Sequence, residues 1–186
     1  MEPIILRGPR ALSAFRLAAL QRQAQALAAP AAIDRLTADT VYFLEADAPL
    51  AAQVRERTLA LLNASGDHAA TDGFYVTPRK GTISPWSSKA TDIFHNCGLT
   101  AVRRVERGVH VRVFGADGGV LPMDSVRALL PLVHDRMTQG VCTSVHDLFL
   151  HRAPAPLVEI DMAAGGRAAL EADRKSTRLN SSHRIR

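Results

Sequence analysis

His95 and Cys97 stand two positions apart and carry the side chains of a metal site or of a thiol nucleophile. A zinc site needs further Cys or His ligands at short spacing, and the sequence offers no second such pair. A nucleophilic thiol needs a base within hydrogen-bond reach, but residues two apart on one helix point in different directions. We therefore expect no metal site and interpret Cys97 as a small buried thiol.

Two further pairs combine an imidazole with a carboxylate, namely His134 with Asp135 and His146 with Asp147. Adjacent residues diverge on a helix, so neither pair forms a dyad without distant partners. Glu106 and Arg107 are interpreted as a strand edge with alternating charge. The sequence thus predicts no self-contained catalytic site.

The stretch GTISPWSSKATDI, residues 81–93, differs in composition from the Ala-, Leu-, Val- and Arg-rich chain around it. Ser84 followed by Pro85 predicts a helix start, and Gly98 stands where a C-terminal glycine is expected. Spacings of three and four on a helix over 85–97 predict an apolar face, which comprises Trp86, Ala90, Ile93 or Phe94, and Cys97. The opposite face would be polar, with Ser88, Lys89, Asp92, His95 and Asn96; Lys89 and Asp92 can pair there at the surface.

The start of this predicted helix has the chemistry of an anion-binding site, because unpaired N–H groups and partial positive charge gather at a helix N-terminus. It lacks the spacing of a P-loop or of a dinucleotide-binding fingerprint. A well-capped helix with a solvated face explains the same residues. The candidate interface or anion-binding residues are Arg79, Lys80, Thr82, Ser84, Ser87, Ser88, Lys89, Asp92, His95 and Asn96.

Strands and helices alternate along the rest of the chain. Strands are predicted at 3–8, 40–46 and 73–78, as one or two strands broken near Gly108 within 101–115, and from residue 140; helices are predicted at 11–27, 48–66 and 125–137. The pattern favours an α+β fold in which antiparallel sheet layers pack against helices, arranged as two roughly similar halves. We expect a first domain over 1–150 and a Pro-rich linker leading to a helix start within 151–172.

The net charge of +5 depends on the last fourteen residues, DRKSTRLNSSHRIR, which hold five of the 23 basic residues and one of the 18 acidic ones. Residues 1–172 are nearly neutral, so we expect no nucleic-acid partner. Residues 173–186 resemble the translation of a sequencing-library adapter, and we expect them to be non-native. No apolar run is long enough to span a membrane, no signal peptide is evident, and two cysteines are too few for a disulfide framework, so a cytoplasmic protein is expected.

The segment TPRKGTISPWSSKATDIFHNCGL followed by VRRVERG closely resembles the N-terminal region of the large, single-chain phosphoribosylformylglycinamidine synthases, also called formylglycinamide ribonucleotide amidotransferases. Three other segments resemble this family in the same order along residues 1–172. They are ILRGPRALSAFR near the start, HDRMTQ at 134–139, and VEIDMAAGGRAALEA at the end.

The resemblance implies an ATP-dependent ligase of purine biosynthesis that converts formylglycinamide ribonucleotide to its amidine with ammonia from glutamine. The family's sites for ATP, Mg²⁺ and substrate, and its glutaminase triad, lie in later domains, so this chain is expected to be inactive alone and to bind no cofactor. Its first domain would resemble a dimer of the small separate subunit of multi-chain versions. It would be a scaffold between the synthase and glutaminase domains. The alternative is a self-contained binding module with an anion site at residues 79–89.

Overall fold

The computed structural model describes residues 3–27, 33–146, 148, 149, 164–169 and 171. Two compact units are distinguished, Met1–His151 and Arg152–Arg186. In the second unit residues 164–169 are helical, as predicted for the end of the chain, and the Arg167 Nε atom lies 3.0 Å from the Glu171 carboxylate one turn away. The predicted linker at 151–162 and the tail at 173–186 lie outside the described residues.

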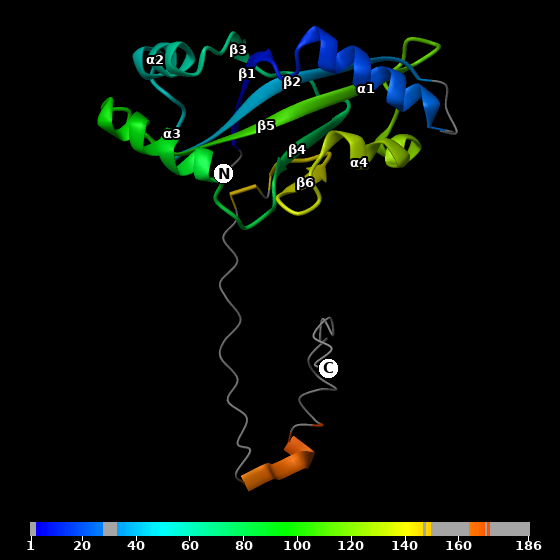
Figure 1. Ribbon diagram of the computed structural model, residues 1–186. Coiled ribbons are helices and arrows are strands. Elements are labelled where there is room, and N and C mark those ends of the chain that lie inside the picture. The colour runs from blue at the N-terminus through cyan, green and yellow to red at the C-terminus, as the bar shows by residue number, and fades with distance from the viewer. Residues whose placement is uncertain (1–2, 28–32, 147, 150–163, 170, 172–186) are drawn as a thin grey trace. The chain divides into compact units, whose positions relative to one another are not determined.

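The first unit is built on one antiparallel sheet of six strands (Figure 1), which confirms the predicted α+β class. The strand order is β3-β1-β2-β5-β4-β6. The strands are β1 (Ile4–Arg10), β2 (Ile33–Ala46), β3 (Gly66–Asp67), β4 (Phe74–Pro78), β5 (Val102–Gly115) and β6 (Gln139–Cys142). By this order the long pair β2–β5 forms the centre of the sheet. Its register runs unbroken from Arg35 opposite Phe114 to Glu45 opposite Arg104.

The three longer helices of the first unit pack on one face of this sheet, as the alternation of β2 allows. They are α1 (Ala14–Ala26), α2 (Ala52–Leu62) and α3 (Pro85–Asn96). Leu20 and Ala24 of α1 contact Leu36 and Ala38 at the start of β2. Further along the same face, Leu62 of α2 and Phe94 of α3 pack with Tyr42, Leu44 and Val105. Figure 1 accordingly shows α1 and α3 toward opposite ends of the β2–β5 pair.

The other face of the sheet carries no helix among the described residues. Val41, Phe43 and Tyr75 on this face are buried by Val145 and Leu148, which belong to the irregular segment after β6.

β5 is a single strand, so the predicted break near Gly108 is wrong. Gly108 serves close packing instead of a turn. A Cβ atom at this position would lie 2.7 Å from the Val76 carbonyl oxygen and 2.8 Å from the Phe43 ring, and no side chain tolerates such distances.

The predicted helix at 125–137 is also wrong in extent. A 3₁₀ turn, η1 (Met123–Leu129), leads into the short α4 (Leu130–Val133), and Val126 leaves the helical conformation at φ −115°. His134 is extended at φ −141° and ψ 150°, and residues 136–138 form a turn that leads into β6. The two-residue strand β3, which pairs with Leu6 and Arg7, was not predicted because its residues have no alternating apolar pattern.

The order strand–helix–strand occurs twice, as β1–α1–β2 and as β4–α3–β5, and in each case the two strands pair antiparallel. These two strand–helix–strand segments meet at the central β2–β5 pair. Whether they correspond to two copies of the separate small subunit stays a prediction.

Candidate functional site

The two ends of α3 are formed by the residues that the sequence singled out. The Ser84 hydroxyl accepts a hydrogen bond from the Ser87 backbone N–H at 3.0 Å, and Pro85 occupies the first turn. At the other end Gly98 adopts φ +76°. Its N–H bonds to the His95 carbonyl, and the Leu99 N–H bonds to the Phe94 carbonyl, which is the Schellman pattern. The predicted caps are therefore confirmed.

The apolar face of α3 includes Phe94 and excludes Ile93. Phe94 is 2% exposed and lies in the core, whereas 54% of Ile93 is exposed. Trp86 is partly buried: its ring stacks on Tyr42 with centroids 5.9 Å apart, and the Arg107 guanidinium carbon lies 5.1 Å from the centroid of the Trp86 ring. Trp86 thus lies at the margin of the core, and its partial burial agrees with its place on the predicted apolar face.

α3 lies along an edge of β5 that no strand covers. β4 pairs with β5 only at Val109–Val111, so the preceding part of β5 lacks a partner on that side. Two side chains of α3 supply the missing hydrogen bonds. The Ser87 hydroxyl donates to the Val105 carbonyl at 2.6 Å, and the Thr91 hydroxyl accepts from the Val105 N–H at 3.1 Å. Ser87 is fully buried in this role, so it does not belong to an exposed polar wall.

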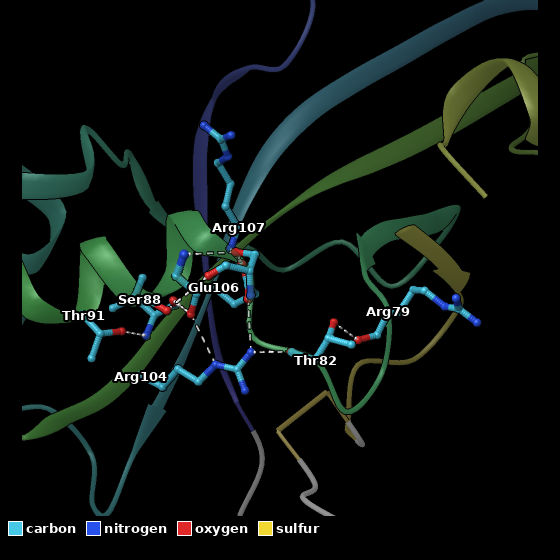
Figure 2. A network of polar contacts seen from close by, with 10 residues as sticks. Arg79, Thr82, Ser88, Thr91, Arg104, Glu106 and Arg107 are labelled. Atoms are coloured by element: carbon cyan, nitrogen blue, oxygen red, sulfur yellow. Dashed lines mark hydrogen bonds and ion pairs between the residues drawn. The ribbon is translucent and has the colours of Figure 1, made fainter. Parts of the chain in front are cut away.

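A buried ion pair fixes the loop before α3 to the same strand (Figure 2). Arg104 lies 3.1 Å from the Glu106 carboxylate, and the Arg104 guanidinium also donates to the Thr82 carbonyl at 2.9 Å. Glu106, which has no exposed surface, accepts a 2.7 Å bond from the Ser84 hydroxyl. It accepts further bonds from the backbone N–H groups of Ser84 and Arg107.

This network was not predicted, since Glu106 was interpreted as part of a charged strand edge. A signal was present in the sequence. Residues two apart on a strand face the same side, so Arg104 and Glu106 were suitable for pairing. What the pattern could not give is their burial, which comes from the covering loop and from Phe149, whose ring centroid lies 5.1 Å from the Arg104 guanidinium carbon.

The Ser84–Glu106 contact is structural in its geometry. The Ser84 oxygen caps α3, and the carboxylate is neutralised by Arg104, so neither group is available for proton transfer.

Asp135 also has a local role. Its carboxylate accepts bonds from the Met137 N–H and the Thr138 hydroxyl, and these hydrogen bonds lower its pKa. His134 bonds to the Leu130 carbonyl, so this adjacent pair is no dyad; the pair at 146 and 147 lies partly outside the described residues.

The loop 79–84 before α3 is called the Ser84 loop below. A groove of about 730 Å³ opens beside this loop on the helical face of the sheet. Its floor includes Thr40 and Val109 from the two central strands, and so it lies between the ends covered by α1 and α3. Three of the predicted site residues line it, namely Arg79, Thr82 and Ser84. Arg107, Ile83 and Met137 also line it and were not predicted.

The remaining predicted residues form an exposed wall on α3. The polar wall, as we call it below, comprises Ser88, Lys89, Asp92, His95 and Asn96, all of which are exposed. His95 bonds through Nε2 to the Val102 carbonyl at 3.0 Å. No ion pair joins Lys89 to Asp92 in the described part of the chain, contrary to expectation. Lys80 precedes this wall in the loop and is exposed.

A second polar cluster lies on the helix-free face of the sheet. The rings of His68 and His110 meet edge to face with centroids 4.5 Å apart, and His110 Nε2 lies 2.6 Å from the Asp72 carbonyl oxygen. Burial lowers the pKa of His68 to about 4 and also lowers the pKa of His110, so these rings are neutral at pH 7. This pair was not predicted, because its members are 42 positions apart in the sequence.

The fold and these sites define the class: a helix-backed antiparallel α+β domain whose charged and hydroxyl side chains mainly fix its own loops. Within the described ranges no group of three or more His, Cys, Asp or Glu residues could hold a metal ion. Cys97 and Cys142 are free thiols, and burial raises the pKa of Cys142.

The family model for the N-terminal region of formylglycinamide ribonucleotide amidotransferase matches residues 39–149. The chain belongs to this family and so carries an N-terminal domain of that enzyme of purine biosynthesis, phosphoribosylformylglycinamidine synthase. The matched range contains the Ser84 loop, the polar wall and the buried ion pair. Among the residues that the structure describes, no helix has the length and apolar character needed to cross a membrane.

Proposed function

We propose that this domain is a non-catalytic interface domain of the amidotransferase. In the proposed reaction the whole enzyme uses ATP and glutamine to convert formylglycinamide ribonucleotide to the amidine. ATP, Mg²⁺ and glutamine would bind to other domains, and this domain would contact the synthase and glutaminase domains in the cytoplasm. The family match over residues 39–149 is the observation that carries the proposal.

The distribution of polar groups supports an interface role. Arg104, Glu106, Ser84 and Ser87 satisfy one another and the edge of β5, which leaves them no capacity for chemistry. These contacts hold the polar wall in one position. Ile93, an apolar side chain with 54% of its surface exposed, follows Lys89 by one helical turn on this wall. An apolar side chain amid polar ones is the composition expected of a surface that another domain covers.

The alternative of an independent anion-binding module has less support. The first N–H groups of α3 are occupied, because the Ser87 N–H bonds to the Ser84 hydroxyl and the Ser88 N–H bonds to the Ser84 carbonyl. The helix start therefore offers few free donors to an anion.

The test uses two measurements on the same substitution. The purified 186-residue chain should show no ATP- and glutamine-dependent amidine formation; detectable turnover would contradict the proposal. Lys89→Ala should change the unfolding free energy of this chain by less than about 0.5 kcal/mol, because the side chain is exposed. In the whole amidotransferase the same change should reduce turnover. If Lys89→Ala unfolds the chain, the polar wall is structural and the interface role fails.

A further inference from the structure

We infer that the groove beside the Ser84 loop binds an extended, acidic segment of polypeptide from another domain of the amidotransferase. The inference rests on the proposed function, and it adds a second contact surface with a stated partner chemistry. The segment would carry two carboxylates separated by apolar residues.

The groove has the size and place of a binding site for a short segment. Its volume of about 730 Å³ falls within the range of pockets that hold ligands of moderate size. The central strands form its floor, where the partly exposed Thr40 and Val109 lie between α1 and α3. Continuous pairing of β2 with β5 from Arg35 to Glu45 holds this floor together.

The charge of the groove favours an acidic occupant. Arg79 and Arg107 line it, and no ion pair involving either side chain occurs among the described residues. The carboxylate among the lining residues, Glu106, is already paired with Arg104 and bonded by Ser84. Two uncompensated guanidinium groups therefore lie at the surface of a domain whose residues 1–172 are nearly neutral. Carboxylates are their natural partners.

The groove also carries exposed apolar side chains. Ile83 is 54% exposed and Met137 is 79% exposed, and they contribute to the lining from two segments far apart in sequence. Methionine adapts its shape to varied partners, so it suits a surface that closes over apolar side chains.

The directions of the two arginines distinguish a polypeptide from a small anion. Figure 2 shows the side chains of Arg79 and Arg107 leading away from Glu106 in different directions. They do not converge on one point, as a phosphate site requires. The bonded N–H groups of Ser87 and Ser88 supply no further donors. Carboxylates spaced along an extended chain match this geometry.

Trp86 provides a reporter, since it lines the groove and is the sole tryptophan of the chain. The 186-residue chain is titrated with a capped hexapeptide of alternating Glu and Leu, with its Lys–Leu counterpart and with inorganic phosphate, while Trp86 fluorescence is recorded. We expect a saturable change of Trp86 fluorescence with the Glu–Leu peptide and none with the Lys–Leu peptide or with phosphate. The double variant Arg79→Gln/Arg107→Gln should weaken this binding at least tenfold.

The matched control is Arg16→Gln/Arg22→Gln, which removes the same charge from exposed positions on α1 outside the groove. It should bind the Glu–Leu peptide with unchanged affinity. Backbone amide NMR shifts of the Val109 region give a second readout, because Arg107 touches the Trp86 ring and its removal alters the fluorescence itself. Unchanged amide spectra away from the groove show that the variants remain folded.

Several outcomes would overturn the inference. The inference fails if the Glu–Leu peptide shows no saturable binding or if the Lys–Leu peptide binds equally well. It also fails if the α1 control variant loses as much affinity for the Glu–Leu peptide as the groove variant does. Phosphate binding that depends on Arg79 and Arg107 would replace the polypeptide by a small anion. The proposed interface role is tested separately, through the effect of Lys89 on the whole enzyme, so it survives failure of this titration.

Discussion

Replacing Glu106 by Gln removes the negative charge from a carboxylate that has no exposed surface and keeps its shape. The carboxylate accepts bonds from Arg104, from the hydroxyl and N–H of Ser84, and from the Arg107 N–H. After the substitution the Arg104 guanidinium, which is 10% exposed, keeps its charge without a compensating partner. Loss of one member of a buried pair costs about 3–5 kcal/mol, and we expect about 3 kcal/mol here because the amide still accepts one bond.

The assay is urea unfolding of the 186-residue chain at pH 7. With a slope of about 1–3 kcal/mol per molar, a loss of about 3 kcal/mol lowers the midpoint by roughly 1 M or more at an unchanged slope. Arg104→Met combined with Glu106→Gln should cost less than the sum of the single changes by about 1–3 kcal/mol, since no buried charge remains unpaired.

Arg103→Gln is the matched control on the neighbouring position of β5. Arg103 pairs with Asp47 at 2.9 Å, but these side chains are 62% and 69% exposed, so the loss should stay below about 1 kcal/mol. The reasoning would be refuted if Glu106→Gln cost no more than Arg103→Gln, or if the effects at Arg104 and Glu106 simply added. In that case the pair would not fix the Ser84 loop.

Phe94→Ala should destabilise the chain by about 3–5 kcal/mol, and Trp86→Ala by clearly less, because Phe94 is 2% exposed whereas Trp86 is partly buried; equal losses in urea unfolding would contradict the assigned face of α3. The free energy of unfolding should fall as pH drops from 6.5 to 4. The folded-state pKa values of His68 and His110 are lowered, so both side chains bind protons more readily in the unfolded chain. For His68, whose folded pKa is about 4, the loss of unfolding free energy is roughly 3 kcal/mol at most and smaller after solvent screening. His68→Gln should therefore reduce the dependence of the unfolding free energy on pH in this window, and an unchanged dependence would contradict the assignment. Deleting residues 173–186 should leave the thermal midpoint unchanged, and a fall of several degrees would show that they belong to the fold.

Local chemistry made both ends of α3 predictable. Ser84 and Pro85 set its start and Gly98 its end through bonds to residues within a few positions, so the sequence window contained all the information. The positions of the longer strands followed from alternation, whereas β3, the first half of β2 and the continuity of β5 did not. The choice between Ile93 and Phe94 was open because the two differ by one helical step, and only the position of α3 on the sheet decides it.

The site depended on distances that no sequence window contains. Ser87 and Thr91 bond to Val105 because β4 ends short and leaves the edge of β5 open, which is a property of strand pairing. The groove exists because α1 and α3 cover opposite ends of one strand pair and leave its middle bare. Polar residues around 79–89 could be found from composition, but their division into buried and exposed groups could not.

The interface role is tested most directly by comparing two activities of the whole amidotransferase. Amidine formation is measured with glutamine and, separately, with added ammonia as the nitrogen source, for the native enzyme and for Lys89→Ala combined with Asp92→Ala. Arg16→Gln/Arg22→Gln on α1 is the control. If the polar wall joins the domain to the others, glutamine-dependent turnover should fall several-fold while ammonia-dependent turnover and the control remain near native values. Unchanged glutamine-dependent turnover in the polar-wall variant would contradict the account.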